Sequence, residues 1–246
     1  MIKELGPGFR LTLAFTILTG LLYPAVMTGL SELIFPRQAN GSLVTVNGNV
    51  VGSSLIGQSF AKPEYFHPRP SAAGNGYDPT QSGGTNLGPT SAKLLHGTTT
   101  TDDKGKETVS FDGIEDRIVH YCLDNNLPYQ SSAPLDHFKD AQGNLDDVKL
   151  IDAFNDPKTP LVFTAEAPIP PDAVTASASG LDPQISPANA EIQAARVAKA
   201  RGVTPDQVNQ LISQFTKRAD WGFWGEPRVN VLLLNIALDQ KVPVSK

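Results

Sequence analysis

The sequence predicts an α+β protein with one N-terminal transmembrane helix followed by a single extracytoplasmic α+β domain. Three observations support this prediction: a long uncharged apolar stretch near the N-terminus, a strong hairpin signal after it, and two clearly delimited helices near the C-terminus. We expect residues 1–10 to lie in the cytoplasm, 11–35 in the membrane and 36–246 outside the cell membrane.

The uncharged stretch Leu11–Ser31 has the length of a membrane span. A helix rises about 1.5 Å per residue, so this stretch would reach about 31 Å, close to the thickness of a bilayer's hydrocarbon core. A cleaved signal peptide is the alternative. A typical signal peptide has a shorter apolar core followed by a small-x-small cleavage site, whereas this stretch is longer and no such site follows it. Gly20 and Pro24 are expected to loosen or kink the helix, and small residues suit close packing against partner helices.

The charges around this stretch favour one orientation. Lys3 and Arg10 precede it and Arg37 follows it. The positive-inside rule therefore favours a cytoplasmic N-terminus and an external soluble domain. Cys122 is the one cysteine, so an internal disulfide is impossible and the redox compartment stays open. The net charge of −5 argues against a nucleic-acid partner, which would require a basic surface.

A hairpin and a long loop are predicted after the apolar stretch. Asn47-Gly48 is the strongest short hairpin signal, because a type I′ turn needs positive φ at both central positions. We expect strands at 43–46 and 49–52. Prolines and glycines then crowd 66–89, which predicts a long loop, ordered by its aromatic residues.

The middle of the chain gives weaker signals. Apolar residues recur on one face over 114–126, which predicts a helix. The preceding stretch 97–113 is polar and is expected to be a surface insertion. The stretch 129–160 is polar and acidic, and we expect it to be irregular. A short strand is expected at 174–176.

The C-terminal part has strong helix signals. Ser186 as N-cap with Pro187 behind it predicts a helix over 187–201. Thr204 repeats the start signal ahead of an amphipathic face over 208–215. The apolar run 229–238 is either a buried strand or a strand running into a helix. The aromatic sequence Trp221–Trp224 is expected to anchor a loop in the core, with ligand stacking or lipid contact as alternatives.

No metal site and no catalytic residue are predicted. None of the histidines forms a His-x-x-x-His pair or a His-Glu-x-x-His motif. The four histidines are His67, His96, His120 and His137. Gly83 and Gly88 are spaced as in a phosphate-binding P-loop, but the lysine that should follow the second glycine is absent.

A membrane-tethered hydrolase at Ser177 or Ser179 is a further alternative. Both serines lie beside Gly180, but the Gly-x-Ser-x-Gly sequence of a nucleophile elbow is absent. We therefore expect these serines to serve in turns, and we expect that the chain on its own is not an enzyme.

Several strings in fixed order nevertheless point to a family. They are Gly52–Phe60, Tyr65–Ala72, Ser82–Thr90, Val174–Pro183, Ile185–Pro187, Arg196–Ala198 and Arg228–Leu232. Together they resemble the C subunit of the bacterial Kdp-type potassium-transporting P-type ATPase. The resemblance covers about 1–95 and 168–239, and the stretch 97–163 departs from it as if polar pieces were inserted.

The resemblance implies an accessory, non-catalytic subunit of a high-affinity potassium uptake pump in the bacterial plasma membrane. The implied partners are a channel-like potassium-translocating subunit, a P-type ATPase subunit, a small single-span subunit and membrane lipid. The implied roles are assembly of the complex and a catalytic-chaperone effect that raises the ATP affinity of the ATPase subunit. No intrinsic cofactor is expected, and ATP enters only through this resemblance. The alternative is a membrane-anchored extracytoplasmic binding protein outside any pump, which would use the loop 66–89.

Two sets of site residues follow from the resemblance. The turn 177–182 lies ahead of the helix predicted over 187–201, and such a turn offers free N–H groups to an anion. The alternative is that this turn only packs against the domain or contacts a partner subunit. The nucleotide-binding candidates are Ser177, Ser179, Gly180, Asp182, Gln193 and Arg196. The partner-interface candidates are Gly20, Pro24, Gln58, Tyr65, Phe66, Arg69, Ser82, Gly83, Gly84, Asn86, Arg228 and Asn230.

Overall fold

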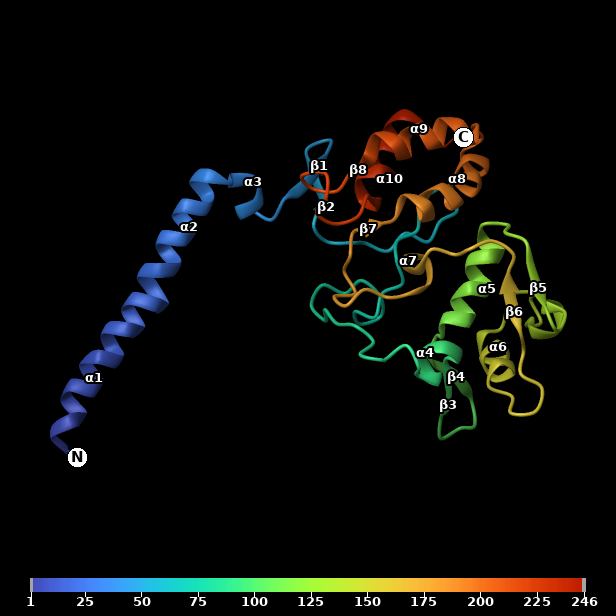
Figure 1. Ribbon diagram of the computed structural model, residues 1–246, viewed down its shortest axis with the longest axis horizontal. Helices are drawn as coiled ribbons and strands as arrows, with labels where there is room; N and C mark the ends of the chain where they lie inside the picture. The colour runs from blue at the N-terminus through green and yellow to red at the C-terminus, as the bar shows by residue number, and fades with distance from the viewer. Residues whose placement is uncertain (1, 245–246) are drawn as a thin grey trace. The chain divides into compact units, whose positions relative to one another are not determined.

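The computed structural model describes residues 2–244 and shows a mixed helix and strand protein, which confirms the predicted fold class (Figure 1). The chain divides into two compact units, Met1–Leu55 and Ile56–Lys246. The first unit carries the apolar helix and also the predicted hairpin. The second carries the remaining helices and sheets.

The first unit begins with a continuous helix made of three consecutive parts (Figure 1). These are α1 (Ile2–Ile17), the π-helical turn η1 (Leu18–Leu22) and α2 (Tyr23–Ile34). The run Leu5–Ile34 is the one helix among the described residues that is long and apolar enough to cross a membrane, and none of it is buried. The predicted N-terminal apolar helix is therefore present.

The π-helical turn explains how the helix accommodates Pro24. A proline inside a helix has no N–H to donate, and its ring clashes with the carbonyl group four residues earlier, here that of Gly20. A wider turn relieves that clash. The structure places this turn at Leu18–Leu22, directly before the proline. The predicted loosening at Gly20 and Pro24 thus takes the form of a π-helical turn.

The hairpin of the first unit follows a short helix, α3 (Pro36–Ala39). Strands β1 (Leu43–Val46) and β2 (Asn49–Ser53) pair antiparallel. Asn47 has φ 51° and Gly48 has φ 82°, the positive values of a type I′ turn. The predicted hairpin is confirmed.

The second unit combines helices with three small antiparallel sheets. The sheets are a β3·β4 hairpin, a β5·β6 pair and a three-stranded sheet in the order β7-β9-β8. The strands are β3 (Thr98–Thr101), β4 (Glu107–Phe111), β5 (Tyr129–Ser131), β6 (Phe163–Ala165), β7 (Gln184–Ile185), β8 (Thr216–Lys217) and β9 (Arg228–Asn230). The helices are α4 (Ala92–His96), α5 (Ile114–Asp124), η2 (Leu135–Phe138), α6 (Asp147–Phe154), α7 (Pro171–Val174), α8 (Pro187–Arg201), α9 (Pro205–Phe215) and α10 (Val231–Lys241).

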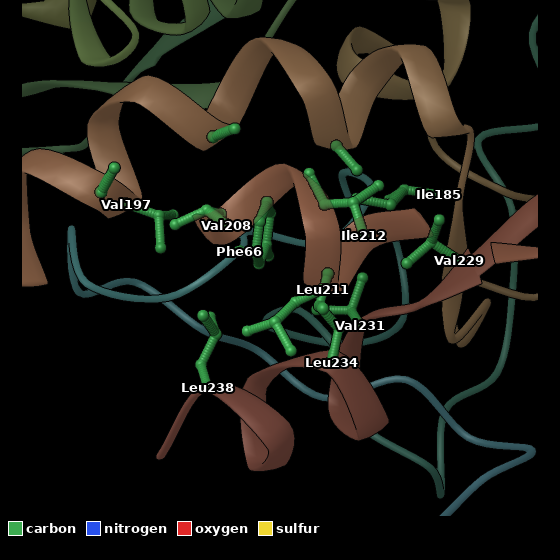
Figure 2. Packing of buried hydrophobic residues seen from close by; sticks show 13 residues of the cluster. Phe66, Ile185, Val197, Val208, Leu211, Ile212, Val229, Val231, Leu234 and Leu238 are labelled. Atoms are coloured by element: carbon green, nitrogen blue, oxygen red, sulfur yellow. The ribbon is translucent and has the colours of Figure 1, made fainter. Parts of the chain in front are cut away.

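The larger hydrophobic core lies between α8, α9, α10 and strand β9 (Figure 2). The predicted helix boundaries here are confirmed. The Ser186 hydroxyl accepts the N–H of Asn189 at the start of α8, and Thr204 forms a capping box with Gln207 at the start of α9. The run 229–238 takes the second predicted form, a strand that leads directly into α10.

A second, smaller core lies between α5 and α6. It contains Val119 of α5, Leu150 and Phe154 of α6, and Leu161. The predicted helix at 114–126 is therefore confirmed as α5, which ends two residues earlier than expected. The structure is not irregular throughout 129–160, because the side chain of Asp146 accepts the N–H groups of Val148 and Lys149 and starts α6.

The stretch 97–113, expected to be a polar surface insertion, contains the β3·β4 hairpin, in which four β-branched threonines form one strand. One further prediction was wrong. The strand expected at 174–176 is absent, and α7 (Pro171–Val174) precedes Thr175 instead. Pro171 at the first helical position favours that short helix.

A segment without helix or strand, residues 56–91, runs across the second unit and is held by side chains instead. The Asn235 amide on α10 accepts the N–H of Phe66 at 2.9 Å and donates to its carbonyl oxygen at 3.0 Å. The Gln193 amide on α8 does the same for His67, at 2.7 and 3.1 Å. These two amides satisfy backbone groups that a strand partner would otherwise satisfy.

Two buried arginines of α8 continue this network. Arg196 donates from Nη1 to the carbonyl oxygens of Pro63 and Tyr65, at 2.8 and 3.0 Å. Arg201, 1% exposed, donates to the Glu64 carbonyl oxygen at 2.7 Å and pairs with Asp239 at 2.9 Å. Together the four side chains fix residues 63–67 against α8 and α10.

Phe66 anchors the same segment by hydrophobic contact, since it is completely buried in the larger core (Figure 2). We expect Phe66→Ala to lower the free energy of unfolding by about 3–5 kcal/mol, because the cavity adds to the lost burial. The control Phe223→Ala removes a ring that is 76% exposed and should change it by less than about 0.5 kcal/mol. Chemical denaturation of the full chain in mild detergent, followed by circular dichroism, measures both. Equal stability of the two variants would contradict this account of the segment.

Candidate functional site

The predicted nucleotide turn closes on itself through its own serines. The N–H of Gly180 donates to the Ser177 hydroxyl at 2.9 Å, and the N–H of Leu181 donates to the Ser179 hydroxyl at 3.1 Å. The two hydroxyls lie 3.4 Å apart. Two N–H groups that an anion could use, those of Gly180 and Leu181, are therefore engaged within the turn.

The same turn is docked on the segment 56–91. The Ser179 carbonyl oxygen accepts the Ser82 hydroxyl at 2.9 Å and the Gly83 N–H at 3.0 Å. The Gly180 carbonyl oxygen accepts the Ser71 hydroxyl at 2.6 Å. A Cβ on Gly84 would lie 3.0 Å from the Ala178 carbonyl oxygen, so that position favours glycine.

An ion pair completes this contact. Arg69 Nη1 lies 3.0 Å from Asp182 Oδ2, and the rest of the guanidinium donates to the Thr175 carbonyl oxygen. The Tyr77 hydroxyl donates to the Arg69 carbonyl oxygen at 2.8 Å, and burial raises the pKa of Tyr77. Hydrogen bonds and this ion pair thus join the segment and the turn into one continuous surface.

Gln193 and Arg196 belong to a different part of the molecule. Both are buried, and their polar atoms bind the backbone of residues 63–67 and the side chain of Asn125. Burial and the positive charge of Arg196 lower the pKa of His67. The structure therefore does not bring these two residues into the turn with the other four nucleotide candidates.

The partner-interface candidates are spread over several environments. Phe66 lies in the core, and the Tyr65 hydroxyl donates to Asp239 at 3.1 Å. Arg228 pairs with Asp220 at 2.6 Å, and Asn230 caps α10 by accepting the N–H of Leu233. The remaining candidates lie at the surface or are partly buried. These are Gly20 and Pro24 on the apolar helix, Asn86 in the long segment and Gln58 near its start.

The aromatic sequence near the C-terminus forms an exposed tip. Trp221, Phe223 and Trp224 are 87%, 76% and 68% exposed. The prediction that they anchor a loop in the core was wrong. We call residues 221–224 the aromatic tip. Asp220 fixes the base of the aromatic tip, because it pairs with Lys217 at 2.8 Å and with Arg228.

A cleft of about 530 Å³ lies between the segment 59–77 and helix α5. Three of its lining residues group closely, although they come from two helices. Asp116 and His120 stand four residues apart on α5, and Asp147 is the first residue of α6. One ligand atom from each lies within 4.8 Å of the others.

Burial and hydrogen bonding shift the pKa values of this group. Desolvation raises the pKa of Asp116 to about 6, and the carboxylates of Asp147 and Asp112 add to the rise. The hydrogen bond from His120 to Asp147, 2.8 Å long, raises the pKa of the imidazole. Perturbed groups that line a cleft mark candidate functional sites.

This cluster was missed at the sequence level. The histidines were compared with His-His spacings, whereas the signal present is Asp116-x-x-x-His120, a spacing that puts both side chains on one helix face. Asp147 joins them only through the packing of α6 on α5, which no local pattern indicates.

Comparison with known proteins assigns the chain to a family. The family model described as K+-transporting ATPase, c chain, matches residues 5–116 and 145–240. This chain belongs to that family. The unmatched stretch 117–144 lies inside the range 97–163 where insertions were expected, but the matched range includes the β3·β4 hairpin.

Full-length relatives agree with that family. A protein of Koribacter versatilis is 41% identical over 244 residues, which cover 99% of this chain and 98% of that protein. A protein of Mycobacterium bovis is 40% identical over 240 residues, covering 98% of this chain and 100% of that protein. One from Rhodospirillum rubrum is 40% identical over 246 residues, covering 100% of both. All three are called potassium-transporting ATPase KdpC subunit.

The docked turn gives a stability prediction at Gly180. This residue has φ 67°, and a Cβ there would lie 2.7 Å from the Cβ of Ala73 and 2.8 Å from the Gly83 carbonyl oxygen. Gly180→Ala should therefore cost about 1–3 kcal/mol of unfolding free energy. At Gly88 a Cβ would meet nothing within 4 Å, so Gly88→Ala is the matched control. Thermal unfolding of both variants measures the difference, and an unchanged midpoint for Gly180→Ala would contradict the docked turn.

Proposed function

We propose that this chain is an accessory subunit of an ATP-driven, high-affinity potassium uptake pump and that its role is to assemble and stabilise the complex. Its family is described as the c chain of a K+-transporting ATPase, a description that presupposes other chains. The proposed partners are a channel-like potassium-translocating subunit, a P-type ATPase subunit and a small single-span subunit.

The observation that carries this proposal is the exposed apolar helix. No residue in the most apolar part of Leu5–Ile34 is buried within the chain, so lipid and partner helices must cover it. A Cβ on Gly20 would meet nothing within 4 Å, which leaves room for close approach of another helix. We propose that the helix lies in the bacterial plasma membrane with the N-terminus inside and the soluble domain outside, as Lys3 and Arg10 favour.

The aromatic tip is the contact that we propose for the channel-like subunit. Three large aromatic side chains within four residues are unfavourable on a surface exposed to water, and such groups are typical of interfaces between proteins. The pairs of Asp220 with Lys217 and Arg228 hold the base of the tip in place, which reduces the entropy lost on binding.

We further propose that the chain is non-catalytic and affects ATP affinity through its contacts with the other subunits. The hydroxyls of Ser177 and Ser179 contact each other and backbone N–H groups, and no imidazole is among their hydrogen-bond partners in residues 2–244. A domain outside the membrane also has no access to cytoplasmic ATP. Conformational coupling across the complex is the remaining route for an effect on ATP affinity.

The aromatic tip predicts a loss of assembly on mutation. A variant with Trp221, Phe223 and Trp224 all changed to alanine should recover less than about a tenth of the partner subunits in a mild-detergent pull-down from potassium-starved cells. Val162→Ala, which truncates an apolar side chain 58% exposed elsewhere, is the control. Undiminished recovery of partners would contradict the proposed contact. Loss of binding to protein-free lipid vesicles, with partners retained, would assign the tip to the membrane instead.

The hydrogen bonds within the turn at Ser177–Asp182 predict that this turn does not bind ATP. In the purified complex, the double variant Ser177→Ala and Ser179→Ala should change the KM for ATP by no more than about twofold. A rise of about tenfold, with the complex still intact by gel filtration, would place a nucleotide contact on this turn. A tagged chain recovered alone from cells that express the partners would favour the stand-alone binding protein.

A further inference from the structure

Asp116, His120 and Asp147 have the geometry of an incomplete coordination shell. His120 Nε2 lies 2.8 Å from Asp147 Oδ1 and 3.9 Å from Asp116 Oδ1. Ligand atoms around a tetrahedral ion with bonds of about 2.0–2.2 Å lie about 3.3–3.6 Å apart, and the two observed distances bracket that range.

The strongest sign of a ligand is an unsatisfied oxygen on Asp116. This residue is 3% exposed, and within the described chain its Oδ1 has no hydrogen-bond partner. A buried carboxylate oxygen without a donor is costly, because desolvation is not compensated. Its nearest cationic neighbour is His120, at 3.9 Å, which is too far for a hydrogen bond.

The three side chains stand on rigid supports. Asp116 and His120 share one face of α5, and Asp147 is fixed at the start of α6, where the Asp146 side chain caps the helix. The buried contacts of Val119 with Leu150 and Phe154 hold the two helices together. A site supported by two packed helices keeps its geometry before an ion binds.

The cleft also supplies access and a favourable charge. The cluster lines the cleft of about 530 Å³, so an ion and water ligands can reach it from solvent. Asp112 and Asp124 line the same cleft, and Arg117 is engaged with Asp112 at 2.8 Å. The carboxylates therefore outnumber the free positive groups around the site, which raises the local concentration of cations.

We propose that Asp116, His120 and Asp147 bind one divalent transition-metal ion, with water completing its coordination. One imidazole and two carboxylates favour ions such as Zn²⁺ over Ca²⁺ and Mg²⁺, which prefer oxygen ligands alone. His120 lies in the stretch 117–144 that the family model leaves unmatched, whereas Asp116 and Asp147 lie within the matched ranges. The ion would clamp α5 to α6.

Zn²⁺ titration of the full-length chain tests the proposal. The protein is purified in mild detergent with a tag free of histidine, treated with a chelator, and titrated by calorimetry against Zn²⁺, Ca²⁺ and Mg²⁺. We expect about one Zn²⁺ per chain and a rise in the thermal midpoint, because an ion that binds only the folded state stabilises it. Absence of Zn²⁺ binding, or tighter binding of Ca²⁺ or Mg²⁺, would overturn the proposal.

Variants locate the site. Asp116→Asn and His120→Gln should each weaken Zn²⁺ binding more than about tenfold and remove the thermal shift. The controls Asp136→Asn and His137→Gln change an exposed aspartate and histidine of the same stretch and should bind Zn²⁺ as the parent does. Circular dichroism without metal establishes that each variant is folded. Equal Zn²⁺ binding by Asp116→Asn and the parent would place the ion elsewhere and refute the assignment.

Discussion

The second unit depends on how buried side chains satisfy the backbone of a segment that has no helix or strand. Residues 63–67 cross the buried surface of α8 and α10, where every N–H and carbonyl group needs a partner. The amides of Gln193 and Asn235 pair with His67 and Phe66, and Arg196 and Arg201 bind the neighbouring carbonyl oxygens. Loss of one partner would leave a buried polar group unpaired, so the network acts as one unit.

This network positions the surfaces that the proposed function uses. Because residues 63–67 are fixed, Arg69 just after them is held in position. Its guanidinium pairs there with Asp182 of the docked turn. Arg228, on the central strand β9 of the three-stranded sheet, pairs with Asp220 at the base of the aromatic tip. A rigid domain with one prearranged apolar contact suits the assembly role that we propose for this subunit.

The sequence predicted the elements that local signals define. The Asn47-Gly48 turn, the Ser186 cap and the start of α9 depend on neighbours within a few residues, and all were found as expected. Helix α6 was missed because its cap, Asp146, lies in a polar stretch with no long apolar period. The aromatic tip was misplaced because composition alone favours burial of tryptophan.

The candidate site was harder to predict, for a physical reason. Gln193 and Arg196 were predicted to bind nucleotide. In the fold, their side chains instead donate hydrogen bonds to the backbone of a segment far away in the sequence, which no local pattern indicates. The cluster at Asp116 likewise needs the packing of two helices. Hydrogen bonds between residues far apart in the sequence produce no periodic pattern from which they could be predicted.

Deletion of this chain tests the central claim, its role in assembly, most directly. The other pump subunits would be expressed under potassium limitation with a tag on the ATPase subunit, with and without this chain supplied from a plasmid. The account predicts that potassium-stimulated ATP hydrolysis and recovery of the channel-like subunit are lost without the chain and restored with it. Recovery of an intact complex with full potassium-stimulated activity in its absence would contradict the account.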